Sequence, residues 1–420
     1  MRFERTRPPS GPATSPAPRA APGPVGAGID RRWFAPALSA VGLVVIGILT
    51  AGLFGGRLPI ELPGVIATVR PTPNPSIVVP AKRTQVRGTV LFVKNGNIWS
   101  ASGTDVQELS RTGNDSSPAW SADGQWIYLI ETRTKNDAFF PYQGTPARYV
   151  LHYPVIVRMH PDGSDRKDVA TSLYTSGPGG RYSYHVWYLQ PAPDPKGGRI
   201  AILSDGPPPP NRDPVIQLMP ATGGKLTSLD LPYTAQLGLA DPTWRADGAA
   251  LAYTHYGRSG FEPAHHIAIY TVGTKKVKIL TGPGYSQPAW SPDGHYLAVV
   301  RWSATGRDVV ILDAASGAQV LAVTNDGQSW APAWSPAGDA LVFLTASGAD
   351  LDLEMAVIRR TGTTFSLGDT LPITEQSQLD GTSRPSWYVP ADQLPTPAPS
   401  SSPAAPSASP SSSSEASATP

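Results

Sequence analysis

Residues 287–300 read QPAWSPDGHYLAVV, and variants of this phrase recur along the chain. Three further copies are clear: SPAWSADGQWIYLI (117–130), DPTWRADGAALAY (241–253) and APAWSPAGDALVFL (331–344). A degenerate copy, APDPKGGRIAIL (192–203), has Pro193 where the others have tryptophan, and RPSWYVP (384–390) stops before its glycine turn. Recurrence at the length of one supersecondary unit predicts a repeat architecture.

Each repeat has the same internal order of elements. A short strand ends at an anchor residue, a turn closes with glycine, and an apolar alternating strand follows. Glycine suits this turn because a tight hairpin needs positive φ, which costs glycine nothing sterically. Two more strands complete a blade. The anchors are Trp120, Pro193, Trp244, Trp290, Trp334 and Trp387. We interpret the tryptophans as structural, because large apolar rings fill the wedge between adjacent blades.

The phrase resembles the TolB-like, WD-like propeller repeat, whose consensus is Pro, any residue, Trp, Ser, Pro, Asp, Gly and then an Ile/Leu-Ala-Phe strand. The copy at 287–300 matches through Pro288, Trp290, Ser291, Pro292, Asp293, Gly294, Leu297 and Ala298. The resemblance covers Gly88–Pro390 and implies a β-propeller. It implies little about function, since the family includes partner-binding propellers, propellers fused to peptidases and a few lyases.

The two ends of the repeat region are complementary. The chain enters at Thr89 with TVLFVKNGNIWSAS, the second and third strands of a unit, and leaves at Trp387 on a first strand. Ends with complementary missing pieces can share one blade, which removes exposed sheet edges. We therefore expect an all-β protein with a six-bladed propeller of four-stranded blades over residues 88–390. Five or seven blades stay open if the Pro193 copy is misassigned or another copy is too degenerate to see.

Composition assigns different roles to the segments outside the repeats. Residues 1–32 are rich in Pro, Ala, Gly and Arg, and residues 391–420 in Pro, Ser and Ala, so we expect both tails to be disordered. The net charge is +2, and the Arg-rich first 32 residues more than account for it. The remainder is slightly acidic, which argues against a nucleic-acid partner. The chain contains no cysteine, which excludes disulfides and thiolate chemistry.

An apolar segment predicts a membrane anchor. Residues 33–56 carry no charge, and Ala35–Phe54 has the length needed to cross the hydrocarbon core. Arg31 and Arg32 precede the segment, so the positive-inside rule predicts a single-pass protein of the cytoplasmic membrane with residues 1–32 in the cytoplasm and the propeller extracytoplasmic. A cleaved signal peptide is the alternative. Residues 57–87 are punctuated by prolines and are expected to form a stalk.

Motifs for catalysis are scarce. The histidines are scattered without metal-ligand spacing, and His160 lies in HPDGSD, a string that suits a hairpin turn as well as a cation loop. Nucleophile-elbow, Walker and dinucleotide motifs are absent, so we expect no cofactor and no metal. The sequence favours a non-catalytic binding platform for a protein, peptide or envelope polymer. The alternative is a propeller-based hydrolase or lyase acting on envelope polysaccharide or peptide.

Two insertions in one repeat predict the binding site. They separate the strands at 127–131 and 154–159, and then that blade from the next over 171–188. In an up-and-down meander the second and fourth connections emerge on one face, so the insertions should be neighbours. Half-exposed rings are typical of stacking or anchoring sites. The candidate residues are Phe139, Phe140, Tyr142, Tyr149, His152, Tyr153, Tyr182, Tyr184, His185, Trp187 and Tyr188. The alternative is that these rings fold back and only cover the degenerate blade, as a structural cap.

Overall fold

The computed structural model describes residues 84–142, 145–206, 213–229, 231, 238–259 and 262–395. The predicted membrane segment at 33–56, most of the stalk and most of the C-terminal tail lie outside these ranges. Within the described ranges, no helix combines the length and the apolar character that a membrane span requires.

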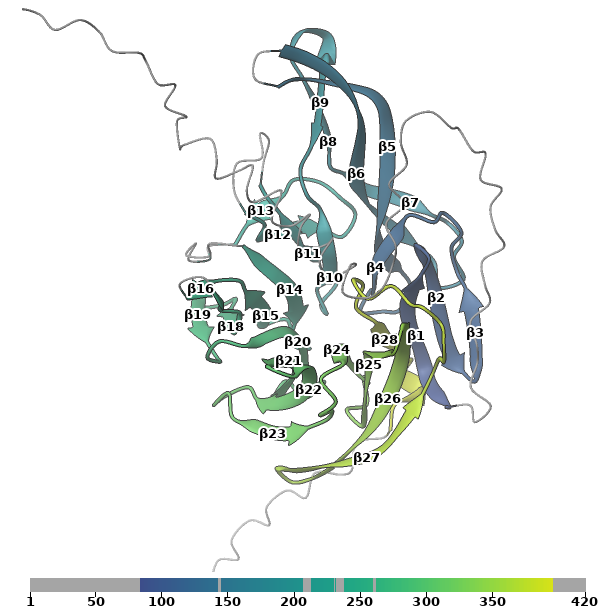
Figure 1. The fold of residues 1–420 in the computed structure, drawn as a ribbon, viewed down its shortest axis with the longest axis vertical. Helices are drawn as coiled ribbons and strands as arrows, with labels where there is room; N and C mark the ends of the chain where they lie inside the picture. The colour runs from purple at the N-terminus through teal and green to yellow at the C-terminus, as the bar shows by residue number, and fades with distance from the viewer. Residues whose placement is uncertain are drawn as a thin grey trace, which may run out of the picture. The chain divides into compact units, whose positions relative to one another are not determined.

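Six four-stranded antiparallel sheets form the blades of a propeller and are arranged in a ring (Figure 1). Blade 1 consists of β28 (Ser386–Tyr388), β1 (Val86–Lys94), β2 (Asn97–Gly103) and β3 (Asp105–Glu108). Blade 2 consists of β4 (Asp115–Trp120), β5 (Ile127–Tyr142), β6 (Thr145–Met159) and β7 (Lys167–Thr171). Blade 3 consists of β10 (Leu189–Pro193), β11 (Arg199–Ser204), β12 (Val215–Pro220) and β13 (Thr227–Ser228).

The second half of the propeller repeats this order. Blade 4 consists of β14 (Leu239–Trp244), β15 (Ala250–His255), β18 (His266–Thr271) and β19 (Lys276–Ile279). Blade 5 consists of β20 (Tyr285–Trp290), β21 (Tyr296–Ser303), β22 (Gly306–Asp313) and β23 (Gln319–Ala322). Blade 6 consists of β24 (Ser329–Trp334), β25 (Ala340–Ser347), β26 (Asp350–Thr361) and β27 (Thr364–Pro372). The predicted all-β, six-bladed architecture is therefore confirmed.

Short elements lie outside the blades. Two small hairpins pair β8 (Leu173–Ser176) with β9 (Tyr182–His185), and β16 (Arg258–Ser259) with β17 (Glu262–Pro263). Two 3₁₀ turns are η2 (Pro178–Gly180) and η3 (Ala391–Gln393).

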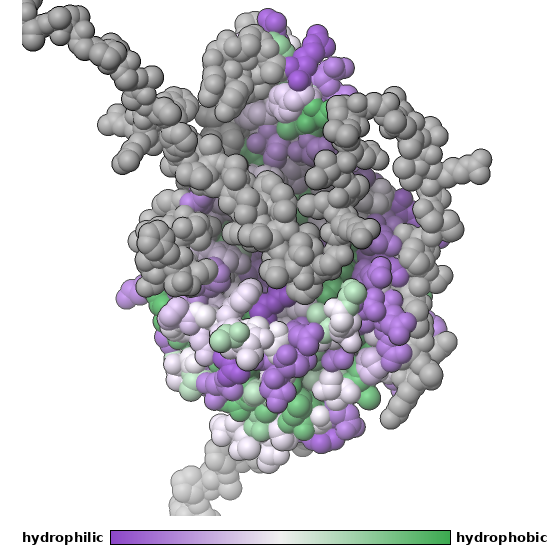
Figure 2. Space-filling model, viewed as in Figure 1, coloured by the Kyte–Doolittle hydropathy of each residue, from purple (hydrophilic) through white to green (hydrophobic). Residues whose placement is uncertain are grey.

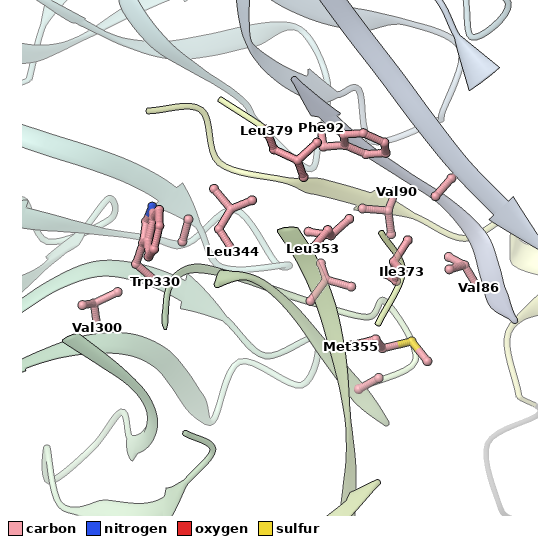
Figure 3. Close-up of a cluster of buried hydrophobic side chains, with 14 residues drawn as sticks. Val86, Val90, Phe92, Val300, Trp330, Leu344, Leu353, Met355, Ile373 and Leu379 are labelled. Carbon is pink, nitrogen blue, oxygen red and sulfur yellow. The ribbon is translucent and has the colours of Figure 1, made fainter. Parts of the chain in front are cut away.

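Blade 1 closes the ring as the sequence predicts. The last strand, β28, is its innermost strand and pairs with β1 from Leu91↔Ser386 to Thr89↔Tyr388. Val90 and Phe92 of β1 pack against Leu353 and Met355 of blade 6 in one buried cluster (Figure 3). Apolar burial and strand pairing therefore join the two ends of the domain.

Buried side chains gather in six clusters, each between two neighbouring blades. Trp244, Trp290 and Trp334 are buried in three of these wedges. Trp120 and Trp387 are partly buried and pack against two more. In the wedge between blades 2 and 3, Tyr188 is buried instead.

The inner strands share a bulge that the repeat dictates. Proline lies two residues before every anchor, and the residue before it adopts a left-handed φ in five strands: Ser117 52°, Gln190 48°, Asp241 54°, Gln287 53° and Ala331 55°. In each of these strands the pairing with the second strand shifts register at this point. Proline lacks an N–H and disfavours a right-handed helical residue before it, so a bulge accommodates it without losing a hydrogen bond.

Strand direction gives the propeller two distinct faces. The connections between first and second strands lie on one face, and those between second and third strands on the other. The chain passes through Thr84, enters β1 at Val86, and ends β28 at Tyr388. Both points lie on the face of the first-to-second-strand turns. Arg87 pairs there with Asp339, at 2.8 Å, and the Tyr388 hydroxyl donates to the Asp123 carbonyl at 3.1 Å. We call this the terminal face, and the other the distal face.

Candidate functional site

The predicted insertions form one projection on the distal face, which we call the tower (residues 132–154 and 172–188). β5 and β6 run far beyond the other strands of blade 2 as one continuous hairpin, and β8–β9 lies beside it (Figure 1). The first insertion was expected as a connection, but in the structure its residues pair with one another and extend both strands. Hydrophilic residues predominate on the part of the tower visible in Figure 2.

Several candidate aromatics hold the two hairpins of the tower together. The Tyr149 hydroxyl donates to the Ser183 carbonyl at 2.6 Å. Phe139 stacks on Tyr182, with ring centroids 5.9 Å apart, and the Arg181 guanidinium lies 4.6 Å from the Phe139 ring. Within the β8–β9 hairpin, Tyr184 stacks on Tyr174 at 6.0 Å. The contacts of Tyr149 and Phe139 bring the two insertions side by side, which is the arrangement that strand alternation predicts.

Other candidate residues differ in exposure. Trp187 is 46% exposed and its backbone N–H donates to Asp205 at 2.9 Å. The His185 ring meets Trp187 edge-on at 5.0 Å, and His152 is exposed with its Nδ1 3.0 Å from the Thr134 hydroxyl. These three can meet a ligand directly.

The remaining candidates contribute differently. Tyr188 is buried in the wedge between blades 2 and 3, and its hydroxyl lies 3.2 Å from that of Tyr174. Burial raises the pKa of Tyr188. Tyr153 packs against the cluster between blades 1 and 2. Phe140 and Tyr142 pair with Ala147 and Thr145 in the hairpin, but their side chains lie outside the described part of the structure.

A cavity of about 610 Å³ occupies the central channel and opens on the terminal face. Its walls carry the anchor of every blade and, in four blades, the proline two residues before it: Pro118, Pro191, Pro242 and Pro385. Ala391 and Leu394, just after the last strand, also line it. The cavity and the tower are therefore on opposite faces of the propeller.

One arginine gives this channel a charged wall. Arg384 donates from one guanidinium nitrogen to the carbonyls of Pro288 at 2.7 Å and Pro332 at 3.3 Å. Burial lowers the pKa of Arg384, and the charge of Asp241 partly opposes that shift. Asp241 is itself held by Gln190 at 3.0 Å and Thr254 at 2.8 Å. These groups form hydrogen bonds between blades, so their first role is structural.

The described residues supply no group of three or more metal-ligating side chains. In the HPDGSD string, the Asp162 carboxylate accepts hydrogen bonds from the backbone N–H and the hydroxyl of Ser164, at 2.9 and 2.6 Å. The Gly163 N–H donates to the His160 carbonyl at 2.9 Å. These contacts are those of a tight hairpin turn.

A row of aromatic rings on the distal face escaped the sequence analysis. We call it the aromatic track. It consists of the rings of Tyr256, His265, Trp302 and Trp330, together with the guanidinium of Arg307. The rings of Tyr256 and His265 meet at 4.5 Å and those of His265 and Trp302 at 6.2 Å. The Arg307 guanidinium lies 5.4 Å from Trp302 and 4.1 Å from Trp330. These residues come from blades 4, 5 and 6, and no local motif joins them. The one signal in the sequence was that Trp302 and Trp330 are tryptophans outside the repeat anchors.

No model of a known protein family matches the chain. An uncharacterized protein of Agrobacterium fabrum is 25% identical over 159 residues, which are 37% of this chain and 44% of that protein. The match thus spans less than half the length of that relative.

Solved structures with the same architecture include TolB from Acinetobacter baumannii, with a TM-score of 0.51 and 20% identity over 74% of this chain and 68% of that one. A putative TolB from Agrobacterium tumefaciens has a TM-score of 0.44 and 16% identity, covering 70% of this chain and 92% of that one. The fold and its repeated inner strand define a six-bladed β-propeller repeat protein. More particularly, the propeller is similar in fold to TolB.

Proposed function

We propose that this protein is a non-catalytic binding platform, held on the cytoplasmic membrane by residues 33–56 with its propeller on the extracytoplasmic side. The carrying observation is the separation of the two faces. Both ends of the propeller leave from the terminal face, whereas the tower and the aromatic track lie on the distal face. A stalk at residues 57–87 would therefore present the distal face away from the membrane.

Rigid presentation supports a recognition role for the tower. Its two hairpins are joined by the Tyr149 hydrogen bond and the Phe139–Tyr182 stack, so exposed groups such as Trp187 are held in place before a ligand arrives. Preorganised aromatic anchors reduce the entropy lost on binding. A protein, a peptide or an envelope polymer could use this surface.

Two measurements test the proposal. A phosphatase fused after Pro390 should be active, because this reporter requires an extracytoplasmic location. A fluorescent protein fused at the same point should be dark. The reverse result would overturn the predicted orientation.

Cross-linking in intact cells tests recognition by the tower. The first variant replaces residues 134–152 by Asn-Gly, which closes β5 and β6 as a short hairpin. The second, as the matched control, replaces His160–Ser164, a turn on the terminal face. The first should lose a cross-linked partner that the wild type and the second retain. Equal capture by both variants would contradict a binding role for the tower.

A further inference from the structure

Six arginines of the described residues lie over aromatic rings, and three of them also have a carboxylate partner. Arg199 over Trp244 pairs with Asp194, and Arg360 over Tyr296 pairs with Asp293. Arg245 over Trp290 pairs with Asp247 at 2.8 Å. Ring contact and ion pair together compensate a cation that loses water.

Arg307 differs from these three. Its guanidinium lies between two indole rings, and the part of the chain that the structure describes supplies no carboxylate partner and no side-chain hydrogen bond for it. The adjacent Asp308 is directed elsewhere: it accepts from the Gly327 N–H at 2.9 Å and lies 3.7 Å from Arg301. Burial lowers the pKa of Arg307, and no neighbouring charge opposes that shift.

A desolvated guanidinium without a counter-ion favours an anionic ligand. The planar fork of arginine matches a carboxylate through two parallel hydrogen bonds, and such charge-assisted bonds are about twice as strong as neutral ones. Arg307 is only half-buried, so a ligand can approach it from the distal face. The two indole rings restrict its rotation and thereby fix the direction of its donors.

Trp302 adds a second recognition element beside this cation. Its side chain is 46% exposed, yet its indole N–H donates to the Ser286 hydroxyl at 2.8 Å, so the ring is fixed in orientation. His265 meets the same ring edge-on. An exposed, fixed indole offers a flat apolar surface for stacking. A matching ligand would carry an apolar ring face and a carboxylate in one unit.

We propose that Arg307 and Trp302 form a binding site for an acidic glycan, with the ring of a uronic-acid unit on Trp302 and its carboxylate on Arg307. A polymer suits the site, because a further sugar unit can extend from Trp302 towards the half-buried His265. The site lies on the face assigned to recognition, so its biological setting rests on the proposed function.

The test uses the full-length purified protein and calorimetric titration with an oligomer of galacturonic acid. A glucose oligomer of equal length and inorganic phosphate serve as probes that lack the carboxylate and the ring, respectively. We expect the uronate oligomer to bind at least about tenfold more tightly than either. Equal binding of the glucose oligomer, or of phosphate alone, would overturn the assignment of an acidic glycan.

Variants locate the site. Arg307→Gln and Trp302→Ala should each weaken uronate binding by at least tenfold, and Arg307→Lys, which keeps the charge but not the fork, should fall between Arg307→Gln and the wild type. The matched control is Arg245→Gln, which alters an arginine over a tryptophan on the terminal face and should leave binding unchanged. Because Trp302 is exposed, Trp302→Ala should retain the melting temperature even if Arg307→Gln does not. Uronate binding unchanged in Trp302→Ala and Arg307→Lys would refute the site.

The outcomes separate this inference from the proposed function. If the protein binds uronate but its propeller proves to be cytoplasmic, the glycan site is supported and the proposed location is wrong. If the protein captures a partner through the tower but does not bind uronate, the binding platform is supported and the glycan site is wrong.

Discussion

Asp241 shows how a single residue at a bulge serves two neighbouring blades. Its backbone N–H donates to the Gln190 side chain at 2.6 Å, and its carboxylate accepts from Gln190 and Thr254. The Thr254 hydroxyl accepts in turn from the Gln287 N–H of blade 5 at 2.9 Å. A left-handed φ before proline thus directs backbone N–H groups sideways, where a side chain of an adjoining blade can satisfy them.

Replacing Asp241 should therefore weaken the whole domain. Asp241→Ala leaves the Gln190 amide and the Thr254 hydroxyl without their buried acceptor, at a cost of about 2–3 kcal/mol in the free energy of unfolding. Denaturant unfolding measures this difference. Asp105→Ala, at an exposed position of β3, is the control and should change the free energy by less than about 0.5 kcal/mol. Equal effects of both variants would show that the hydrogen bonds of Asp241 do not stabilise the domain.

Glycine at the turn of blade 2 is required for space as well as for backbone conformation. Gly124 has φ +67°, and a Cβ added there would overlap the ring of Tyr388 from blade 1. Gly113 has φ +70° but nothing within 4 Å of an added Cβ. Both alanine variants should lose about 1–2 kcal/mol for the left-handed conformation. Gly124→Ala should lose more, because Tyr388 must move, and thermal melts of the two proteins should show this difference.

Among the elements, the connection between β15 and β18 concentrates titratable rings. His255 and His266 stack at 4.5 Å across these strands, and His265 lies beside Tyr256. Burial lowers the pKa of all three histidines below 6.5, and the charge of Asp241 partly opposes the shift of His265. The connection is therefore packed as neutral rings.

Acidification should loosen this connection before the carboxylates titrate. A histidine whose pKa is lower in the folded state binds fewer protons than in the unfolded state, so its contribution to stability is fully present above pH 6.5 and is lost as pH falls through the folded pKa. We expect the melting temperature to fall between about pH 6.5 and pH 5. His265→Gln with His266→Gln should flatten this dependence, whereas His152→Gln on the tower should not.

At the scale of elements, the sequence was informative wherever the repeat phrase survives. Pro193 replaces an anchor tryptophan, yet 189–193 is the inner strand of blade 3, because the Gly197 turn and the alternating strand that follows retain the pattern. The tower was predicted as two neighbouring insertions, but its long strands were not, since pairing register depends on contacts between residues far apart. The aromatic track was missed for the same reason.

The whole molecule depends on a closure made by three residue pairs between β28 and β1 and by the apolar cluster behind them. Without β28, blade 1 has no inner strand and its neighbours lose their shared wedge. The ring would then open at an unpaired edge.

Truncation tests this dependence directly. A chain ending at Arg384 lacks β28 and should lose cooperative unfolding and become sensitive to protease throughout the propeller. A chain ending at Pro395 keeps every described strand and should melt like the full-length protein. If the shorter chain melts like the longer one, the shared blade does not hold the ring closed. Circular dichroism with limited proteolysis distinguishes these results.

Because the two ends of the propeller meet within one sheet on one face, the order of strands along the chain is separable from their order in space. A circular permutant that joins Tyr388 to Thr84 by a short linker and starts at Asp115 would keep every strand pair, but each blade would then be continuous along the chain. Such a permutant should reach the same fold with its tether relocated between blades 1 and 2. The ring of blades therefore does not require the chain to begin at one particular strand. The position of the termini determines only the point at which the propeller is tethered.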